Sequence, residues 1–439
     1  MIKKITVIGG GLAGCEAAWT VANLGVDVDL YEMRPQKNTP AHKTSYLGEL
    51  VCSNSLKSKD PETPAGLLKS EMQDLGSLIL EAATYAHIPA GQALGVDRHL
   101  FSSYITEKIE NHPRIQVIRE EITSLPKESV CIIATGPLTS DALTQEIQQY
   151  TGYNRLYFFD AISPIVNAES IDMEKCFRAS RYDKGGDDYL NCPLTEEEYH
   201  HFVSELLKAE KVEIKAFEQN YYFESCLPIE VLAERGPMTL AFGPMKPVGL
   251  MDPKTGKRPF AVVQLRMENQ YGTLYNLVGF QTKLKYPEQK RIFSLIPALH
   301  NAHFERLGSI HRNTYINSPD LLTRKLQLKK NPFFFFAGQI TGVEGYVESA
   351  SMGIVAGLYA HAFVADKKRG EPPHTTALGA LLQYITTPNP HFQPMNINFG
   401  LLPPGEHRDK KIRKQKIIEK ARSDFKEWFN IVIPAKAGI

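Results

Sequence analysis

The feature that most constrains the fold of this chain is a glycine-rich turn close to its N-terminus. Residues 5–8, "ITVI", are continuously apolar, as expected of a strand buried on both faces of a parallel sheet. The turn "GGGLAG" follows at residues 9–14. A helix-like run, "CEAAWTVANLG", then ends at Gly25, and a second strand-like run ends at Glu32. This G-x-G-x-x-G pattern between a strand and a helix predicts a dinucleotide-binding fold.

Residues of this turn have distinct physical roles in such a fold. Gly9 permits the tight turn, Gly11 lets the backbone approach a pyrophosphate, and Gly14 lets the helix pack closely on the strand. The helix N-terminus favours the bound anion, and Glu32 is placed to accept hydrogen bonds from an adenosine ribose. A glycine-rich turn that binds nothing is the alternative, and the strand–turn–helix context disfavours it. The predicted cofactor-binding residues of this segment are Gly9, Gly10, Gly11, Leu12, Ala13, Gly14 and Glu32.

The composition is that of an ordinary globular protein. The chain has 439 residues and a formal net charge of +1, so we expect two or three domains, and any nucleic-acid site must come from a local patch. The six cysteines form no C-x-x-C pair, which favours a reducing compartment over a disulfide framework or a zinc ribbon. His200 and His201 are adjacent and would point apart on a helix, and we expect no metal.

The N-terminus resembles a signal peptide only in its first residues. Two lysines precede an apolar run, but glycines soon interrupt that run and Glu16 follows. No apolar segment approaches the roughly 18–20 residues that a membrane helix needs. The sequence therefore predicts a cytoplasmic protein without a membrane partner.

Two later segments favour FAD over NAD as the dinucleotide, a choice that the first motif leaves open. Residues 130–139, "VCIIATGPLT", resemble the second strand and turn of flavoproteins with two dinucleotide-binding folds. Residues 332–357 resemble their closing segment, in which a helix containing Gly353 and Gly357 points its N-terminus at the flavin. A buried strand with an ordinary loop is the alternative. The residues added to the predicted cofactor site are Thr135, Gly136, Gly338, Gln339, Gly342 and Gly345.

These segments predict the fold class and the domain organisation. We expect an α/β protein with a Rossmann-like, two-dinucleotide-binding FAD fold and an inserted α+β domain. The FAD-binding domain would comprise residues 1–136 and 331–439, and the insertion residues 137–330. Within the insertion, the pattern predicts strands at 261–265 and 275–280 and helices at 196–210 and 287–298.

Longer segments carry a more specific resemblance. The chain resembles the folate- and flavin-dependent tRNA (uracil-5-)-methyltransferases, which are related to the flavoprotein that modifies the wobble uridine of tRNA. The match extends over nearly the whole chain. It is carried by "YEMRP", "GELVCSNSLKS", "ATGPLTS", "YDKGGDDYLNCP", "ESCLPIEVLAERG", "KPVGLMDPKTGKRPFAVVQLR", "TLYNLVGFQT", "HRNTYINSP", "AGQITGVEGYVESA" and "FQPMNINFGLLP".

The resemblance implies a reaction, its cofactors and its partner. Such enzymes make 5-methyluridine at U54 in the T-loop of tRNA. The carbon comes from 5,10-methylenetetrahydrofolate, and the electrons come from NADH or NADPH through FAD. The resemblance thus implies a tRNA substrate and no required protein partner.

Two cysteines match functional thiols of that family. Cys226, in "YYFESCLPIE", matches the nucleophile that adds to uracil C6. Its local sequence alone would favour a buried structural cysteine. A thiolate there needs nearby positive charge, which Arg235 could supply and which Glu224 and Glu230 would oppose. Cys52, in "ELVCSNSLKS", matches the second thiol, proposed to assist the flavin or proton transfer at C5, with a core cysteine as the alternative.

An RNA substrate requires a contact surface, and the sequence offers two basic ones. Residues 406–422 carry eight Lys/Arg against three acids, and apolar residues follow at helical spacing: Ile417, Ala421, Phe425 and Trp428. Such a helix could contact phosphates, or it could simply be solvated. "RKLQLKK" at 324–330 is the weaker candidate. The aromatic triplet 221–223 could stack on a displaced base or belong to the core.

Three other functions fit parts of the sequence. A flavoprotein that modifies the wobble uridine is expected to have a longer C-terminal helical extension. An RNA-binding flavoprotein without methyl transfer would not need Cys52 and Cys226. A small-molecule flavin oxidoreductase would turn over NADH without tRNA or folate.

Overall fold

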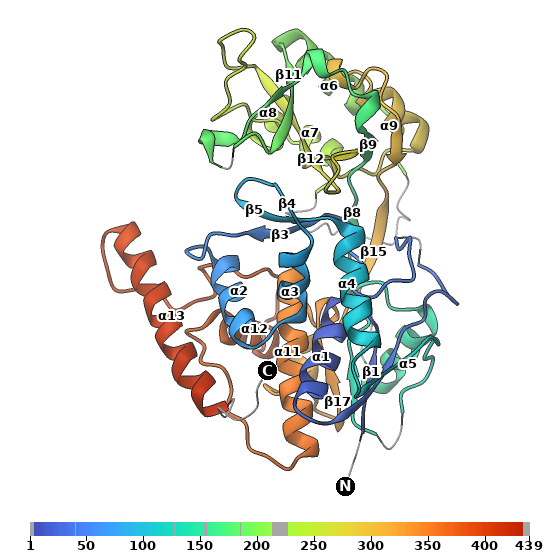
Figure 1. Cartoon of the computed structure of the whole chain (residues 1–439), viewed down its shortest axis with the longest axis vertical. Coiled ribbons are helices and arrows are strands. Elements are labelled where there is room, and N and C mark those ends of the chain that lie inside the picture. Colours follow the sequence, from blue (N-terminus) through green and yellow to red (C-terminus); the bar gives the residue numbers. More distant parts are fainter. Residues whose placement is uncertain are drawn as a thin grey trace.

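The protein consists of two units, one above the other in Figure 1. A computed structural model describes residues 4–39, 41–126, 129–152, 156–184, 186–212 and 227–432, and the statements below refer to these residues. We call the lower part the dinucleotide unit, since it contains the glycine turn, and the upper part the inserted unit, since it comes from the middle of the chain. The predicted α/β architecture with an α+β insertion is confirmed.

A six-stranded sheet forms the centre of the dinucleotide unit, in the order β16-β17-β7-β1-β2-β6. Strand β17 returns from far along the chain to pair with β7, so the N-terminal and C-terminal parts of the chain share one sheet. The edge strand β16 is antiparallel to β17 and the other neighbours pair in parallel. The strands are β1 (Lys4–Ile8), β2 (Asp27–Tyr31), β6 (Ile115–Ile118), β7 (Cys131–Ile133), β16 (Gln327–Leu328) and β17 (Asn331–Phe336).

Two helices rich in small residues cross in close contact beside this sheet. Helix α1 (Leu12–Asn23) begins directly after the glycine turn, and α11 (Tyr346–Val364) packs along it. A Cβ on Gly353 would overlap the carbonyl oxygen of Ala13, so this close approach requires glycine. The surrounding elements are α2 (Pro64–Asp74), α3 (Leu78–Tyr85), α4 (Arg98–Glu110), α12 (Ala377–Thr386) and a small sheet of β3 (Ser55–Ser58), β4 (His87–Ile88) and β5 (Ala93–Val96).

Helix α11 is more apolar than the sequence led us to expect. In length and composition it could cross a membrane, contrary to the expectation that no segment would approach this length. However, 89% of its apolar window is buried inside the protein. Its apolar side chains therefore serve the core between the sheet and the neighbouring helices.

The inserted unit is built on an antiparallel sheet, in the order β10-β11-β12-β13-β9-β14. Its strands are β9 (Ile165–Asn167), β10 (Phe177–Arg178), β11 (Tyr189–Leu194), β12 (Ala261–Met267), β13 (Leu274–Leu277) and β14 (Phe304–Arg306). Helices α6 (Glu196–Lys208), α7 (Ile229–Glu234), α8 (Thr239–Phe242) and α9 (Tyr286–Phe293) contribute to a core that is separate from that of the dinucleotide unit.

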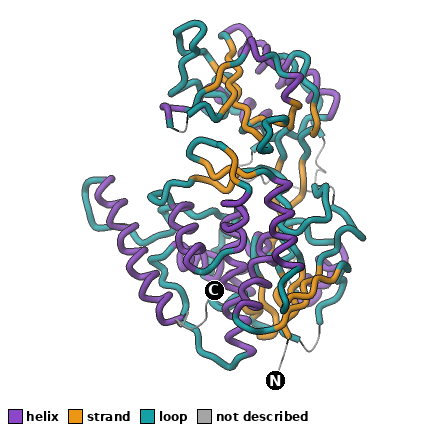
Figure 2. The backbone as a smooth tube through the Cα atoms, viewed as in Figure 1, coloured by secondary structure: helices purple, strands orange, loops and turns teal. Residues whose placement is uncertain are grey.

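A two-stranded ribbon connects the two units. Strands β8 (Leu156–Ala161) and β15 (Ile310–Tyr315) pair antiparallel, so the chain leaves and returns side by side (Figure 2). The ribbon lies inside the predicted insertion limits of 137 and 330. Helix α5 (Asp141–Thr151) precedes the ribbon, and its Leu143 and Ile147 pack in the core of the dinucleotide unit, as does Leu321 after the ribbon.

Two predicted elements of the inserted unit are shorter than expected. The helix predicted at 287–298 ends at Phe293, because Pro297 cannot continue it and instead begins a short 3-10 turn. The strand predicted at 275–280 ends at Leu277, and Gly279 then turns the chain with a φ of 79°. The other two elements predicted for this unit are confirmed, as α6 and β12.

Candidate functional site

A cavity lies at the carboxyl ends of the parallel strands, where open α/β sheets bind ligands. Ile8, Tyr31 and Ala134, at or next to three strand ends, line it. Its volume is about 980 Å³, including space open to solvent. We call it the dinucleotide cavity.

The glycine turn forms one wall of this cavity. Gly9 adopts a φ of 103°, which favours glycine, and a Cβ on Gly14 would overlap the Gly9 carbonyl oxygen. Gly11 differs, because a Cβ built there would meet no protein atom within 4 Å. Its backbone therefore faces open space at the N-terminus of α1, where a pyrophosphate would fit. Of the turn residues, Gly9, Gly11, Leu12 and Ala13 line the cavity, whereas Gly10 and Gly14 pack behind it.

Glu32 lines the same cavity and is held by two groups. One carboxylate oxygen accepts from the Gly10 amide at 2.9 Å, and the other accepts from Arg34 Nε at 2.8 Å. Burial alone would raise the pKa of Glu32. The hydrogen bonds and charge of Arg34 outweigh burial and lower that pKa, so the carboxylate is ionised at neutral pH. An ionised carboxylate in this position is able to accept hydrogen bonds from hydroxyl groups in the cavity, and its contact with a ribose stays a prediction.

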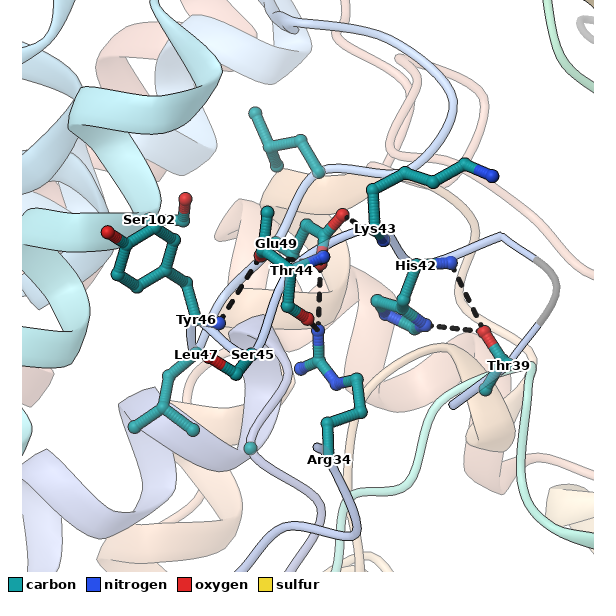
Figure 3. A network of polar contacts seen from close by, with 12 residues as sticks. Arg34, Thr39, His42, Lys43, Thr44, Ser45, Tyr46, Leu47, Glu49 and Ser102 are labelled. Atoms are coloured by element: carbon teal, nitrogen blue, oxygen red, sulfur yellow. Dashed lines mark hydrogen bonds and ion pairs between the residues drawn. The ribbon is translucent and has the colours of Figure 1, made fainter. Parts of the chain in front are cut away.

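Arg34 contacts Glu32 and also the segment of residues 41–49, and Figure 3 shows its guanidinium directed at Glu49. The Arg34 side chain is buried, with 1% exposed, and donates through Nη1 to Glu49 at 2.9 Å. Glu49 in turn accepts from the Thr44 hydroxyl and from the Lys43 and Thr44 amides. The sequence analysis did not single out Arg34. The sequence signal that could have identified it is its position two residues after Glu32, the predicted ribose acceptor.

Other parts of the cavity wall come from the two later segments that were predicted to bind the cofactor, residues 130–139 and 332–357. Thr135, Gly136 and Gln339 line the dinucleotide cavity. Gly338, Gly342 and Gly345 do not, although all three have positive φ. A Cβ on Gly338 would crowd Ala13, and one on Gly342 would overlap the Phe392 ring. These two glycines therefore serve packing around the site.

A second cavity adjoins the first and contains Cys52. Its lining includes Cys52, Lys57, Arg266 and Gly345. We call it the Cys52 cavity. The two cavities are neighbours that share part of their walls, since five residues line both: Val51, Pro137, Leu138, Gln339 and Tyr346.

Cys52 is half-buried and is held by Tyr346, the first residue of α11. The Tyr346 hydroxyl oxygen accepts from the Cys52 amide at 2.8 Å and from the Ser53 amide at 3.2 Å. It also lies 3.0 Å from Cys52 Sγ. Burial, and next the charge of Cys52, raise the pKa of Tyr346 well above its ordinary range, so this tyrosine stays protonated. Sequence reasoning had placed Tyr346 only within a glycine-rich signature.

Cys226 lies outside the described residues, as do Glu224 and the aromatic triplet 221–223. Glu230 is described and fully buried. Burial raises its pKa, while its carboxylate accepts from the Lys283 amide at 2.6 Å and the Thr282 hydroxyl at 3.1 Å. The Glu230 carboxylate therefore has a structural role, because its hydrogen bonds connect α7 to the segment that follows β13.

The cysteines expected to be structural are buried. Cys15 and Cys131 have no exposed surface, and burial raises the pKa of both thiols. Among the described residues, no group of three or more His, Cys, Asp or Glu side chains is placed to hold a metal ion.

A wide cleft between the two units opens beside both cavities. Lys37 and Lys43 line it from the dinucleotide unit, and Lys290 and Arg306 from the inserted unit. Asp141 and Glu305 are the acidic residues in its lining. Pro137 and Leu138 line the cleft as well as the two cavities, so the cleft adjoins both of them. The sequence analysis missed this surface, because its lysines lie far apart in the chain.

The two basic segments found from the sequence are placed differently. Helix α13 (Lys410–Val432) lies at the outer edge of the dinucleotide unit beside α2 (Figure 1). It buries Ala421, Phe425 and Trp428 as predicted, although Ile418 takes the buried position expected of Ile417. In the segment 324–330, Arg324 pairs with Glu371 at 2.6 Å, and Lys329 and Lys330 donate to backbone carbonyls.

Comparison with known proteins identifies the family. The family model described as glucose inhibited division protein A matches residues 4–368. The methylenetetrahydrofolate–tRNA-(uracil-5-)-methyltransferase of Aquifex aeolicus is 61% identical over 438 residues, covering 99% of this chain and 98% of that protein. The protein of the same name from Geobacter sulfurreducens is 58% identical over 435 residues, covering 98% and 100%.

A solved structure supports the fold. The structure of Aquifex aeolicus GidA in its form II crystal aligns with a TM-score of 0.70 at 17% identity, over 99% of this chain and 74% of that one. At this identity the likeness concerns the fold alone. On sequence, the chain belongs to the glucose inhibited division protein A family and, within it, to the methylenetetrahydrofolate–tRNA-(uracil-5-)-methyltransferases.

Proposed function

We propose that this enzyme methylates C5 of the T-loop uridine U54 of tRNA. The carbon would come from 5,10-methylenetetrahydrofolate, with FAD as bound cofactor and NADH or NADPH as reductant. The observation that carries the proposal is that the dinucleotide cavity and the Cys52 cavity lie side by side and share lining residues such as Gln339 and Tyr346. A thiol is thereby placed beside a dinucleotide site, as a flavin-dependent carbon transfer to uracil requires.

The residues present fit FAD. The open backbone at Gly11 suits the pyrophosphate, and the ionised Glu32 suits a ribose. Thr135, Gly136 and Gln339 would border the rest of the cofactor. When bound, the flavin would carry reducing equivalents and the one-carbon unit between folate and uracil.

The chain's own part in the reaction would be thiol chemistry and proton transfer. Uracil C5 becomes nucleophilic only after a nucleophile adds to C6, and a thiolate is suited to that addition. We assign it to Cys226, on the match of its motif to the family. We assign Cys52 to proton transfer at C5, because its sulfur lies 3.0 Å from a protonated Tyr346 hydroxyl within the cavity.

The cleft between the units is the proposed path of the RNA. Lys43 and Lys290 are exposed on its two sides, where they can contact phosphates across it. Because the cleft reaches Leu138, a displaced base could enter the Cys52 cavity from it. Helix α13 remains the second candidate surface.

One assay tests the function. Purified flavin-loaded protein, unmodified tRNA, NADPH or NADH, and labelled methylenetetrahydrofolate should yield labelled 5-methyluridine at U54. A tRNA with cytidine at that position should stay unlabelled. Label at the wobble uridine would instead support the related activity, and NADH oxidation without RNA labelling would support a small-molecule oxidoreductase.

Three variants test the thiol assignments. Cys226→Ala and Cys52→Ala should each retain the bound flavin and lose methylation by at least about 100-fold, the usual scale for removing an acid–base or nucleophilic group. Cys176→Ala is the matched control, because Cys176 packs in the core of the inserted unit. Methylation by Cys226→Ala at the rate of the control would refute the nucleophile assignment.

A further inference from the structure

The loop that carries Cys52 is held by three arginines from different elements. Residues 50–53 belong to no strand or helix, so their carbonyl groups need donors from elsewhere in the protein. Arg98, the first residue of α4, donates to the Leu50 carbonyl at 2.6 Å and to the Cys52 carbonyl at 3.4 Å. Arg306, at the end of β14, donates to the Val51 carbonyl at 2.8 Å.

The third arginine holds the far end of the loop. Arg266, in β12, donates to the Asn54 side-chain oxygen at 2.8 Å and to the Ser53 hydroxyl at 3.0 Å. Asn54 is itself buried and donates to the Met267 carbonyl at 2.8 Å. Two of the three arginines therefore reach across from the inserted unit to the loop of the dinucleotide unit.

These arginines also set the charge around Cys52. Arg98 forms an ion pair with Glu268 at 2.5 Å, so the Glu268 carboxylate balances the positive charge of Arg98. Arg266 and Arg306 donate to neutral acceptors on the loop, and burial, the largest influence on each, lowers the pKa of both. A guanidinium nevertheless stays charged at any physiological pH.

The remaining charged and titratable groups of the Cys52 cavity are accounted for. Lys57 from β3 pairs with Glu348 of α11 at 2.5 Å. Glu344, before α11, accepts from the side-chain amide of Gln339 at 2.6 Å, and its negative charge in the lining of the cavity opposes a thiolate. Tyr346 remains protonated, as described above. Arg98 and Arg306 both interact electrostatically with Cys52, and Glu268 offsets the charge of Arg98. Arg306, together with Arg266 in the lining of the cavity, therefore supplies the positive charge that favours a thiolate over a thiol at Cys52.

We propose that Arg306 and Arg266 of the inserted unit are positioning residues for Cys52: they hold its loop in the cavity and favour its thiolate form. Docking of the inserted unit thereby completes the thiol site, in addition to forming one side of the cleft. This inference rests on the proposed role of Cys52, but its test does not, because thiol reactivity is measured without tRNA or folate.

The experiment follows alkylation of Cys52 by iodoacetamide as a function of pH, in flavin-loaded full-length protein, with the Cys52 peptide quantified by mass spectrometry. Arg306→Gln should slow alkylation at pH 7 about tenfold and raise the pH midpoint by about one unit. Arg306→Lys, which keeps the charge, should stay within about twofold of the wild type. A loop that was merely loosened would alkylate faster without a change in midpoint.

Arg181→Gln is the matched control. Arg181 also lies in the inserted unit and donates to two backbone carbonyls, those of Lys246 and Val248, but not to the Cys52 loop. It should leave both the rate and the midpoint unchanged. If Arg306→Gln does not accumulate as folded protein, Arg266→Gln takes its place with the same expected result. An unchanged midpoint in the folded glutamine variant overturns the proposal, whatever the methylation activity of Cys52→Ala.

Discussion

At the scale of single residues, two buried carboxylates close helix ends that are distant in sequence. Glu71 of α2 accepts from the Ala377 and Leu378 amides, both at 2.8 Å, at the start of α12. Glu16 of α1 does the same for the Leu78 and Ile79 amides of α3. These amides are the ones that a helix leaves unpaired at its N-terminus. Each acid thus accepts the hydrogen bonds that water would accept at an exposed helix N-terminus.

Glu71 should make stability depend on pH. Burial raises the pKa of Glu71 from 4.5 to about 8. The folded protein therefore binds more protons than the unfolded chain between these values, and stability falls as pH rises through that window. In Glu71→Gln this decline should become shallower by up to about 1.4 kcal/mol per pH unit. Denaturant unfolding between pH 5 and 8 measures it, with the exposed Glu62→Gln as control. Equal slopes in both variants would contradict the assignment.

The Tyr346 hydroxyl should contribute to stability as well as to the site. Tyr346→Phe removes the acceptor for the Cys52 and Ser53 amides while keeping the ring. Leaving such donors unpaired should lower the free energy of unfolding by about 1–3 kcal/mol. Tyr384→Phe is the control, because it removes a hydroxyl with one exposed partner, the Gln393 carbonyl. It should lower the free energy of unfolding by less. A loss in Tyr346→Phe no larger than in this control would argue against the described hydrogen bonds.

At the scale of elements, the crossing of α1 and α11 determines where the N-terminus of α1 points. The residues at this crossing are small, and glycine at 353 lies against the Ala13 backbone. Helix α11 in turn begins at Tyr346, which holds Cys52. One helix pair therefore positions both the glycine-turn wall of the dinucleotide cavity and Cys52.

Two glycine variants should separate folding from cofactor binding. Gly11 has a φ of −77° and no neighbour within 4 Å of an added Cβ, so Gly11→Ala should change stability by less than about 1 kcal/mol yet lose bound flavin. Gly353→Ala should instead cost about 1–3 kcal/mol, because its Cβ overlaps the Ala13 carbonyl. Flavin absorbance and thermal unfolding of the flavin-free proteins measure the two effects. Full flavin content in Gly11→Ala would contradict the proposed pyrophosphate position.

At the scale of the whole molecule, the two units together form surfaces that neither has alone. The cleft combines lysines of both units, and the Cys52 loop is held by arginines of both. A change where the two units meet should therefore affect RNA binding and thiol reactivity together.

The cleft should contribute more to tRNA affinity than α13 does. Lys43→Glu combined with Lys290→Glu should weaken binding and reduce the salt dependence of log Kd by about two, one for each phosphate that a lysine no longer neutralises. Lys411→Glu combined with Lys416→Glu makes the same charge change on the exposed face of α13 and should have a smaller effect. Affinities at several salt concentrations measure this. A larger decrease in affinity in the α13 variant would favour the helix as the RNA surface.

Local patterns predicted much of the fold because their causes are local. The glycine turn, the strand before it and the acid at its end follow from a continuous segment, and so does the amphipathic face of α13. Patterns failed where a single residue interrupted an element, as Pro297 and Gly279 did. Arg34, Arg98, Arg266 and Arg306 could not be found from periodicity, because their partners lie in distant segments.

The amino-acid sequence by itself determined the dinucleotide-binding architecture and the family, since each depends on residues that are neighbours in the chain. The roles of Cys52 and Cys226 stay predictions from the same local motifs. Tertiary structure alone decided which glycines line the cavity and which pack behind it, and that Cys52 lies against Tyr346. It also decided that two arginines of the inserted unit, Arg266 and Arg306, donate hydrogen bonds to the Cys52 loop. The reason is physical: hydrogen bonds and electrostatic interactions act over a few ångströms of space, whatever the separation along the chain.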